Sequence, residues 1–252
     1  MEVAAIMEAL KENRDRKLPR EALKQAIAQQ DEITPLLLAE FTPAQAKAAE
    51  IDANPDYFRH LYALYLLAQF RETKAYPIII DFISVPGDVV MDIMGDLVTE
   101  DLGCILASVC GGDLSPIKQL IENSELNEYV RGAGFKALIT LAIEGELSRK
   151  SVLEYFEELW PKLQEAKEEE DDFISHSLLM SILDLCPNES LTSLLRTAYA
   201  ADQVDPQWSD IDDLEDQLEI GVENSIEDLG TRRYYRFVTD TVASMDWWAC
   251  FK

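Results

Sequence analysis

The amino-acid sequence predicts an all-α fold assembled from paired antiparallel helices. Three observations lead to this prediction: apolar residues recur at helical spacing, several prolines follow residues that cap helices, and an apolar pattern repeats about every 40 residues. No segment alternates between polar and apolar residues for long enough to indicate a sheet. With 48% hydrophobic and 9% aromatic residues, the chain of 252 residues can bury a core.

Five prolines mark expected helix starts. Each follows a residue whose side chain can cap a free backbone N–H, and proline tolerates the next position because its missing N–H has no intrahelical partner there. The pairs are Thr34–Pro35, Thr42–Pro43, Asn54–Pro55, Ser115–Pro116 and Asp205–Pro206. The β-branched run at 78–80 lies between helix-like flanks, so we expect a buried helix there.

A weak internal repeat accompanies the helical pattern. Residues 67–70 align with 106–109 at an offset of 39 residues, which also aligns Pro77 with Pro116, and 141–143 follow about 35 residues later. Helical pairs at this spacing are typical of HEAT- and armadillo-like α-solenoids, in which each pair covers the apolar face of the next. We therefore predict such a solenoid of about four to five helix pairs, with an irregular helical bundle as the alternative.

We expect a single domain over residues 1–252. Residues 1–54 form N-terminal helices, residues 55–201 the repeated helical pairs, and residues 202–252 an acidic helix followed by an aromatic C-terminal cap. Residues 202–228 contain eleven acids and no base, but apolar residues at helical spacing indicate that this stretch packs on one face. The acidic run 168–172, which follows Lys167, is expected to be a solvated loop between helices.

The charge of the chain excludes two classes of partner. It carries 22 Lys and Arg against 48 Asp and Glu, a formal charge of −26. Residues 1–30 carry +1 and residues 231–252 carry +2, so residues 31–230 carry −29. Phosphates and anionic headgroups repel such a surface, so we expect neither nucleic acid nor membrane as a partner. The N-terminus has no signal-peptide pattern, and we expect a cytoplasmic location.

Catalytic and metal-binding motifs are scarce. The chain has two histidines and four cysteines, with no Cys-x-x-Cys pair, phosphate-binding glycine loop or hydrolase nucleophile elbow. We expect buried, reduced thiols, and we assign no catalytic residue, no cofactor and no metal ligand. An enzyme is the less favoured interpretation.

Carboxylates near residue 96 form the best candidate interaction surface. Asp92, Asp96 and Glu100 recur at i, i+4 and i+8, which places them on one face if the segment is helical. Alternatively, Thr99 is the N-cap of the next helix, and Glu100 and Asp101 are acids of its first turn, where the helix dipole favours them. We favour this second interpretation because glycines at 95 and 103 interrupt a continuous helix.

Four further residues complete the candidate surface. His60 lies in an apolar helix and is expected to pack there. Arg71 is one of several arginines, together with Arg131, Arg232, Arg233 and Arg236, that we expect to pair with carboxylates of adjacent helices. Trp247 and Trp248 belong to an aromatic terminus that either docks on the helices or remains exposed for a partner; we favour docking.

Four separate segments resemble a bacterial family catalogued as domain of unknown function 1186. They are Pro19–Pro35, His60–Arg71, Gly95–Ser108 and Trp247–Phe251, and the likeness extends over nearly the whole chain. The resemblance implies a helical, HEAT-like protein of this length and no established activity.

The expected function is a non-catalytic protein-interaction or scaffold module with a basic or polar protein partner. The alternative is a HEAT-like ligand-binding protein or lyase-type enzyme, with a groove lined by His60, Tyr62, Tyr65 and the acids near Asp96. An assembly factor with weak, broad contacts is a third interpretation, and the sequence does not separate it from the first.

Overall fold

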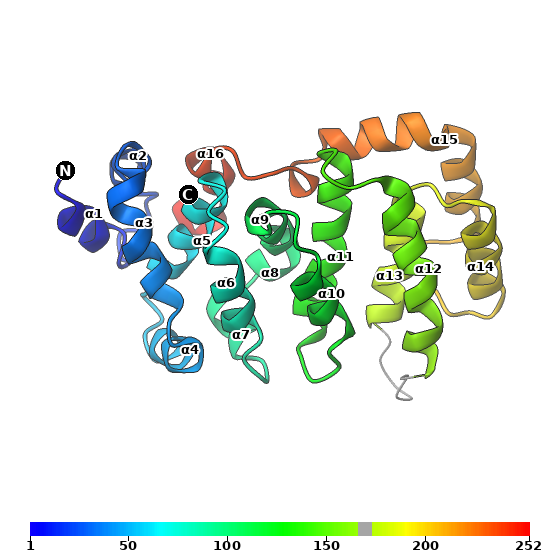
Figure 1. Ribbon diagram of the computed structural model, residues 1–252, viewed down its shortest axis with the longest axis horizontal. Helices are drawn as coiled ribbons and strands as arrows, with labels where there is room; N and C mark the ends of the chain where they lie inside the picture. The colour runs from blue at the N-terminus through cyan, green and yellow to red at the C-terminus, as the bar shows by residue number, and fades with distance from the viewer. Residues whose placement is uncertain (166–172) are drawn as a thin grey trace.

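The computed structural model describes residues 1–165 and 173–252, and it shows that this part of the chain is all-helical (Figure 1). Within it there are sixteen α-helices, three short 3-10 helices and no β-strand. The prediction of an all-α fold is therefore confirmed for the described residues. The acidic run 168–172, expected to be a solvated loop, lies outside them. None of the described helices is long and apolar enough to cross a membrane.

The N-terminal half consists of short helices. They are α1 (Val3–Ala9), α2 (Arg20–Ala28), α3 (Gln30–Leu38), η1 (Ala39–Phe41), α4 (Ala44–Asp52), α5 (Arg59–Gln69), α6 (Ala75–Ile83), α7 (Val89–Met94), α8 (Leu97–Glu100) and α9 (Leu102–Val109). Helix α6 contains the three isoleucines at 78–80, so the expected helix there is confirmed.

The C-terminal half has longer helices and ends in short ones. They are α10 (Ser115–Glu122), α11 (Glu128–Ile143), α12 (Arg149–Glu165), α13 (Phe173–Asp184), α14 (Glu189–Ala200), α15 (Ile211–Thr231), η2 (Arg233–Tyr235), α16 (Thr241–Met245) and η3 (Ala249–Phe251).

Two of the five expected helix starts are found. Pro43 immediately precedes α4, and Ser115 begins α10. Pro35 instead lies inside α3, because buried Ile33 and Leu37 continue the apolar face of a helix that begins earlier. Pro55 and Pro206 lie in turns before α5 and α15.

The turn at Pro55 has a physical cause in the N-terminal segment. The backbone of residues 56–58 pairs with that of residues 11–13: Asn13 N donates to Asp56 O at 3.1 Å, and Phe58 N donates to Lys11 O at 2.9 Å. These bonds tie residues 56–58 to the N-terminal segment, and α5 begins only at Arg59.

Helix α11 lies at the centre of the packing. It contacts α9, α10, α12 and α13, and in Figure 1 the helices stand side by side from α1 at one end to α14 at the other. After α15, residues 232–252, which we call the return segment, run back along this row to α5 and α2 (Figure 1). The C-terminus thus lies near the N-terminal helices.

Glycine 103 permits the close approach of α9 and α11. It lies within α9, so the expectation that Gly103 interrupts a helix is wrong. A Cβ atom at this position would lie 2.5 Å from Lys136 Cβ and 2.9 Å from the carbonyl oxygen of Ala133. The absence of a side chain lets the two backbones pack directly.

The acidic helix α15 is less buried than the sequence indicates. Leu214 and Leu229 are buried, but Trp208 before the helix is 68% exposed and Ile220 is 47% exposed. Gly221 has φ 78° and kinks the helix beside Ile220, which turns part of the apolar face away from the core.

Replacement of Gly103 by alanine is expected to destabilise the protein by about 1–3 kcal/mol, because the added Cβ overlaps α11. Gly230→Ala is the matched control: its Cβ would come no closer than 3.7 Å to any neighbour, and alanine favours a helix by about 0.5–1 kcal/mol. Urea denaturation measures both. Equal stability of the two variants would contradict the close packing of α9 on α11.

Candidate functional site

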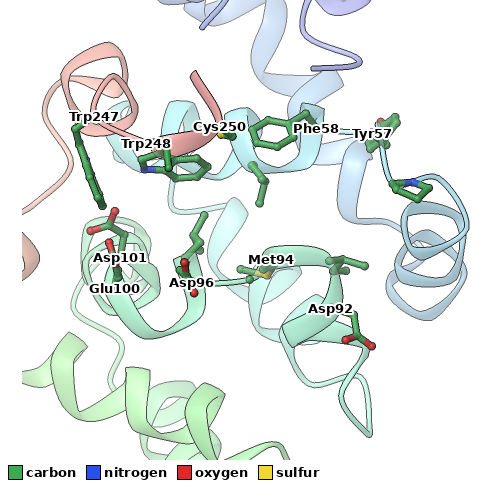
Figure 2. Close-up of a pocket in the computed structure, with 16 residues that line it drawn as sticks. Tyr57, Phe58, Asp92, Met94, Asp96, Glu100, Asp101, Trp247, Trp248 and Cys250 are labelled. Carbon is green, nitrogen blue, oxygen red and sulfur yellow. The ribbon is translucent and has the colours of Figure 1, made fainter. Parts of the chain in front are cut away.

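A pocket of about 470 Å³ lies between the return segment and helices α5, α7, α8 and α9 (Figure 2). Its walls combine aromatic and apolar side chains with carboxylates, and we call it the acidic–aromatic pocket. The carboxylates are Asp92, Asp96, Glu100 and Asp101. The other lining residues are Pro55, Tyr57, Phe58, Leu61, Ile93, Met94, Gly95, Leu97, Trp247, Trp248, Ala249 and Cys250.

The four carboxylates reach the pocket from a broken helical path, not from one helix. Gly95, with φ 54°, ends α7 after Met94, and α8 covers only four residues. The stripe on one helix face is therefore wrong, although Asp92, Asp96 and Glu100 still line one pocket.

The capping interpretation of this segment is also wrong in detail. Thr99 lies inside α8, and its hydroxyl donates to the backbone oxygen of Asp96 at 3.1 Å. Asp101 occupies the N-cap position of α9, but its side chain makes no cap hydrogen bond. The carboxylate is used for tertiary contacts instead.

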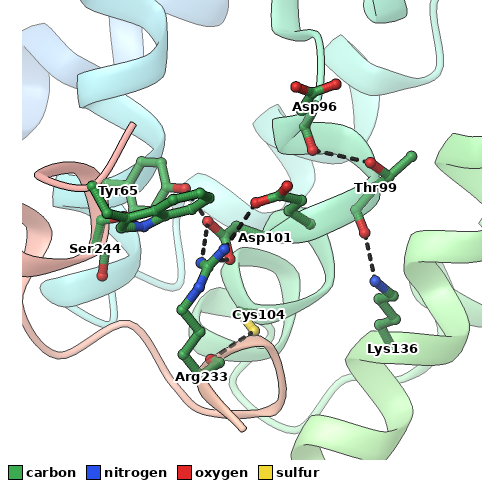
Figure 3. A network of polar contacts seen from close by, with 10 residues as sticks. Tyr65, Asp96, Thr99, Asp101, Cys104, Lys136, Arg233 and Ser244 are labelled. Carbon is green, nitrogen blue, oxygen red and sulfur yellow. Dashed lines mark hydrogen bonds and ion pairs between the residues drawn. The ribbon is translucent and has the colours of Figure 1, made fainter. Parts of the chain in front are cut away.

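Asp101 connects three parts of the fold. It is 5% exposed, accepts a hydrogen bond from the Tyr65 hydroxyl at 2.5 Å, and pairs with Arg233 Nη1 at 2.9 and 3.1 Å (Figure 3). Arg233 Nη2 also contacts Glu100 at 2.8 Å. Burial opposes the charge of Arg233, yet the two carboxylates raise the pKa of its guanidinium. Burial and the adjacent Asp101 raise the pKa of Tyr65.

The two tryptophans dock on this ion pair and on α5. The guanidinium of Arg233 lies 3.9 Å from the ring centre of Trp247, whose side chain points toward Glu100 and Asp101 in Figure 2. The ring centre of Trp248 lies 5.7 Å from Tyr65 and 6.1 Å from Phe58. These contacts agree with the interpretation that the aromatic terminus docks on the helices, and they place it beside α5.

Further contacts fix the rest of the return segment to the helices that it crosses. Arg236 Nε lies 2.7 Å from Glu144 Oε1, Val238 N donates to Ser108 Oγ at 3.0 Å, and Thr241 N donates to Gln69 Oε1 at 2.8 Å. Arginine pairing with carboxylates of other helices was expected. The sequence alone did not identify the partners.

His60 and Arg71 belong to the candidate surface predicted from the sequence but do not line the pocket. His60 is 1% exposed, and its Nε2 lies 2.8 Å from the carbonyl oxygen of Ile93, which forms the pocket wall. Arg71 lies at the end of α5, where its guanidinium stacks 3.6 Å from the ring centre of Phe237 in the return segment. His60 therefore contacts the backbone of the pocket wall from behind, and Arg71 contacts the return segment.

Negative charge dominates the pocket. Its lining contains four carboxylates and no basic side chain. Arg233 neutralises part of the charge at Glu100 and Asp101, but the carboxylates of Asp92 and Asp96 form no ion pair within the described residues, and both residues are exposed. The potential between the aromatic walls therefore favours a cation.

Several lining residues were missed by the sequence analysis. Tyr57 and Phe58 precede α5, Met94 ends α7, and Cys250 lies in the terminal turn. They meet only because the return segment folds back on α5, and no local spacing records that contact. The one usable signal was the concentration of aromatic residues near 57–65 and 247–251.

Replacement of Arg233 by glutamine is expected to cost about 2 kcal/mol of stability, because it leaves the buried Asp101 carboxylate without its cation. Arg196→Gln is the matched control. Arg196 also contacts a carboxylate, through three hydrogen bonds, but this pair with Glu215 is half exposed and is worth about 0–1 kcal/mol. Urea denaturation followed by tryptophan fluorescence compares them; an equal loss in both variants would refute the central role of Asp101.

His60 is expected to make stability dependent on pH. Burial lowers its pKa from 6.5 to about 4, so the folded protein keeps the ring neutral while the unfolded chain binds a proton below about pH 6.5. Stability from this group is complete above pH 6.5 and falls by about 3 kcal/mol as the pH decreases to 4. In His60→Gln this part of the dependence should disappear. Parallel stability curves for the two proteins from pH 7 to 4 would contradict it.

Comparison with known proteins identifies the family of the chain. The family model described as "Protein of unknown function (DUF1186)" matches residues 1–252. Uncharacterized proteins of Chlamydia muridarum and Chlamydia trachomatis are each 36% identical to the chain over 249 residues; these cover 98% of the chain and 97% and 96% of the relatives. No solved structure matches. The chain therefore belongs to the DUF1186 family of proteins of unknown function.

Proposed function

We propose that the protein is a non-catalytic interaction module that binds a basic segment of a partner protein in the acidic–aromatic pocket. One hollow carries this proposal. It is lined by Asp92 and Asp96, which form no ion pair with any residue that the structure describes, and by the aromatic side chains of Tyr57, Phe58 and Trp247. Lysine or arginine side chains bind over aromatic faces and gain further from nearby carboxylates.

The scaffold in this proposal is a HEAT-like solenoid. The side-by-side arrangement of helices in Figure 1 and the packing of α10 on α11 and of α12 on α13 support it. Extended helical arrays of this kind present long surfaces for partner proteins. We also propose a cytoplasmic location for the protein.

The chemistry of the pocket favours binding over catalysis. Its lining contains no histidine or lysine, and burial raises the pKa of the Cys250 thiol, which keeps it protonated and weakly nucleophilic at neutral pH. Tyr62 and Tyr65 of the alternative groove enzyme are completely buried and do not line the pocket. The same carboxylates that attract a basic segment repel phosphates, which agrees with a protein partner.

A fluorescent arginine- and lysine-rich peptide tests the proposal by fluorescence anisotropy. We expect binding that weakens as salt rises and that weakens at least tenfold in the double variant Asp92→Asn/Asp96→Asn, because attraction of the pocket for a cation decreases. A peptide of the same length with glutamine in place of each base should not bind.

The matched control is Asp212→Asn/Glu219→Gln, which removes two exposed charges from α15 and leaves the pocket intact. This variant should retain nearly wild-type affinity. Equal losses in the two double variants would show that the peptide responds to total charge alone, and the proposed site would be wrong. Absence of binding to the wild-type protein at low salt would also reject it.

A further inference from the structure

A second and larger hollow lies on another part of the molecule. Its volume is about 690 Å³, and it lies between α11, α13 and the turn that precedes α15, with Tyr235 of the return segment at one end. We call it the α11–α13 pocket. It shares no lining residue with the acidic–aromatic pocket, so its properties are independent of the function proposed above. Its volume lies in the range of about 300–1,000 Å³ that is typical of small-molecule sites.

Aromatic rings form the sides of this pocket. Tyr129 and Phe173 pack against each other at a tilt of 56°, with ring centres 4.6 Å apart, and the ring centres of Trp208 and His176 lie 5.6 Å apart. Trp208 is 68% exposed although it lines a hollow. An aromatic side chain left in water at the edge of an apolar cavity offers its face to a flat ligand.

Two opposite charges face the same pocket without contacting each other. Lys136 Nζ donates to the backbone oxygen of Thr99 at 2.5 Å, and the Asp184 carboxylate accepts a hydrogen bond from the Tyr235 hydroxyl at 2.6 Å. No ion pair joins Lys136 to Asp184 in the part of the chain that the structure describes, although Arg232 Nη1 lies 4.0 Å from Asp184 Oδ1. Both groups thus keep hydrogen-bonding capacity: the ammonium has three N–H donors, and a carboxylate has about four acceptor positions.

Partial burial leaves these two charged groups less well solvated than they would be in water. Burial lowers the pKa of Lys136, against the attraction of neighbouring acids. Burial also raises the pKa of Asp184, against the effects of Tyr235, Arg232 and Lys136. Each group therefore lies in surroundings that solvate its charge poorly, and a ligand that hydrogen-bonds both would be favoured.

We propose that the α11–α13 pocket binds a planar heteroaromatic molecule whose edge carries a hydrogen-bond acceptor beside a donor, as in an amide or imide group within a fused ring. The acceptor contacts Lys136, the donor contacts Asp184, and the ring lies among Phe173, Trp208 and Tyr129. A ring system of this kind gives both partly buried charges a partner along one rigid edge, and its flat faces match the aromatic walls.

Lumichrome is a suitable probe, since it is a fluorescent, planar three-ring compound with an imide edge. We expect it to bind the wild-type protein with a dissociation constant below about 100 µM, detected by a change in its fluorescence anisotropy. Acridine has three fused rings but no amide edge, and it should bind at least tenfold more weakly because Lys136 and Asp184 gain no partner.

Variants locate the binding. Lys136→Met should weaken lumichrome binding at least tenfold, and Trp208→Ala, at an exposed position that leaves the core intact, should weaken it several-fold. Lys150→Met is the control, because the Lys150 side chain is 83% exposed on α12 and does not line the pocket. Circular dichroism checks that each variant is folded.

Each result decides the proposal. Selective binding of lumichrome that is lost in Lys136→Met and weakened in Trp208→Ala supports it. Equal affinity for acridine would show an apolar hollow without recognition of the edge, and no detectable lumichrome binding up to its solubility limit would reject the ligand class. Unchanged affinity in Trp208→Ala would place the bound probe elsewhere and overturn the assignment.

Discussion

The buried carboxylate of Asp101 is the constraint on which the arrangement of the site depends. A charge that is 5% exposed requires compensating donors, and here they come from Tyr65 in α5 and Arg233 in the return segment. Because Arg233 must reach Asp101, the chain after α15 folds back over α9. That path brings Trp247 and Trp248 to the acids of α7 and α8 and closes the acidic–aromatic pocket.

The uneven distribution of charge acquires a structural meaning from this path. Residues 231–252 carry +2 in a chain of −26, and their arginines pair with carboxylates of the acidic middle, at Asp101 just before α9 and at Glu144 after α11. These ion pairs therefore neutralise part of the negative charge within the molecule. Asp92 and Asp96 form no ion pair with the residues that the structure describes. They therefore leave a local negative surface among aromatic rings.

Sequence patterns predicted the helices well and their meeting points poorly. The all-α fold followed from apolar spacing, which is a local property, whereas Thr34–Pro35 failed as a helix start because burial of Ile33 and Leu37 outweighed the local cap signal. Gly103 was taken as a helix breaker, although its role is the close approach of α11. Glycine has both uses, and only the partner helix distinguishes them.

The candidate surface was partly predicted, and for partly incorrect reasons. Asp92, Asp96 and Glu100 were chosen as one helical stripe, and Gly95 breaks that helix, yet all three line the pocket. His60 and Arg71 were chosen with them but support neighbouring elements from outside it. Phe58 could not be identified, because its contact with Trp248 joins residues 190 positions apart in the sequence.

Hydrogen exchange of the return segment tests most directly whether the C-terminus builds the pocket. The amides of Val238 and Thr241 donate to Ser108 and Gln69 of the helices below. We expect both amides to exchange slowly, with protection close to that of buried amides in α9 and α11. Exchange at the rate of an unfolded chain, with α9 and α11 still protected, would show that the return segment is not docked and would contradict the pocket itself.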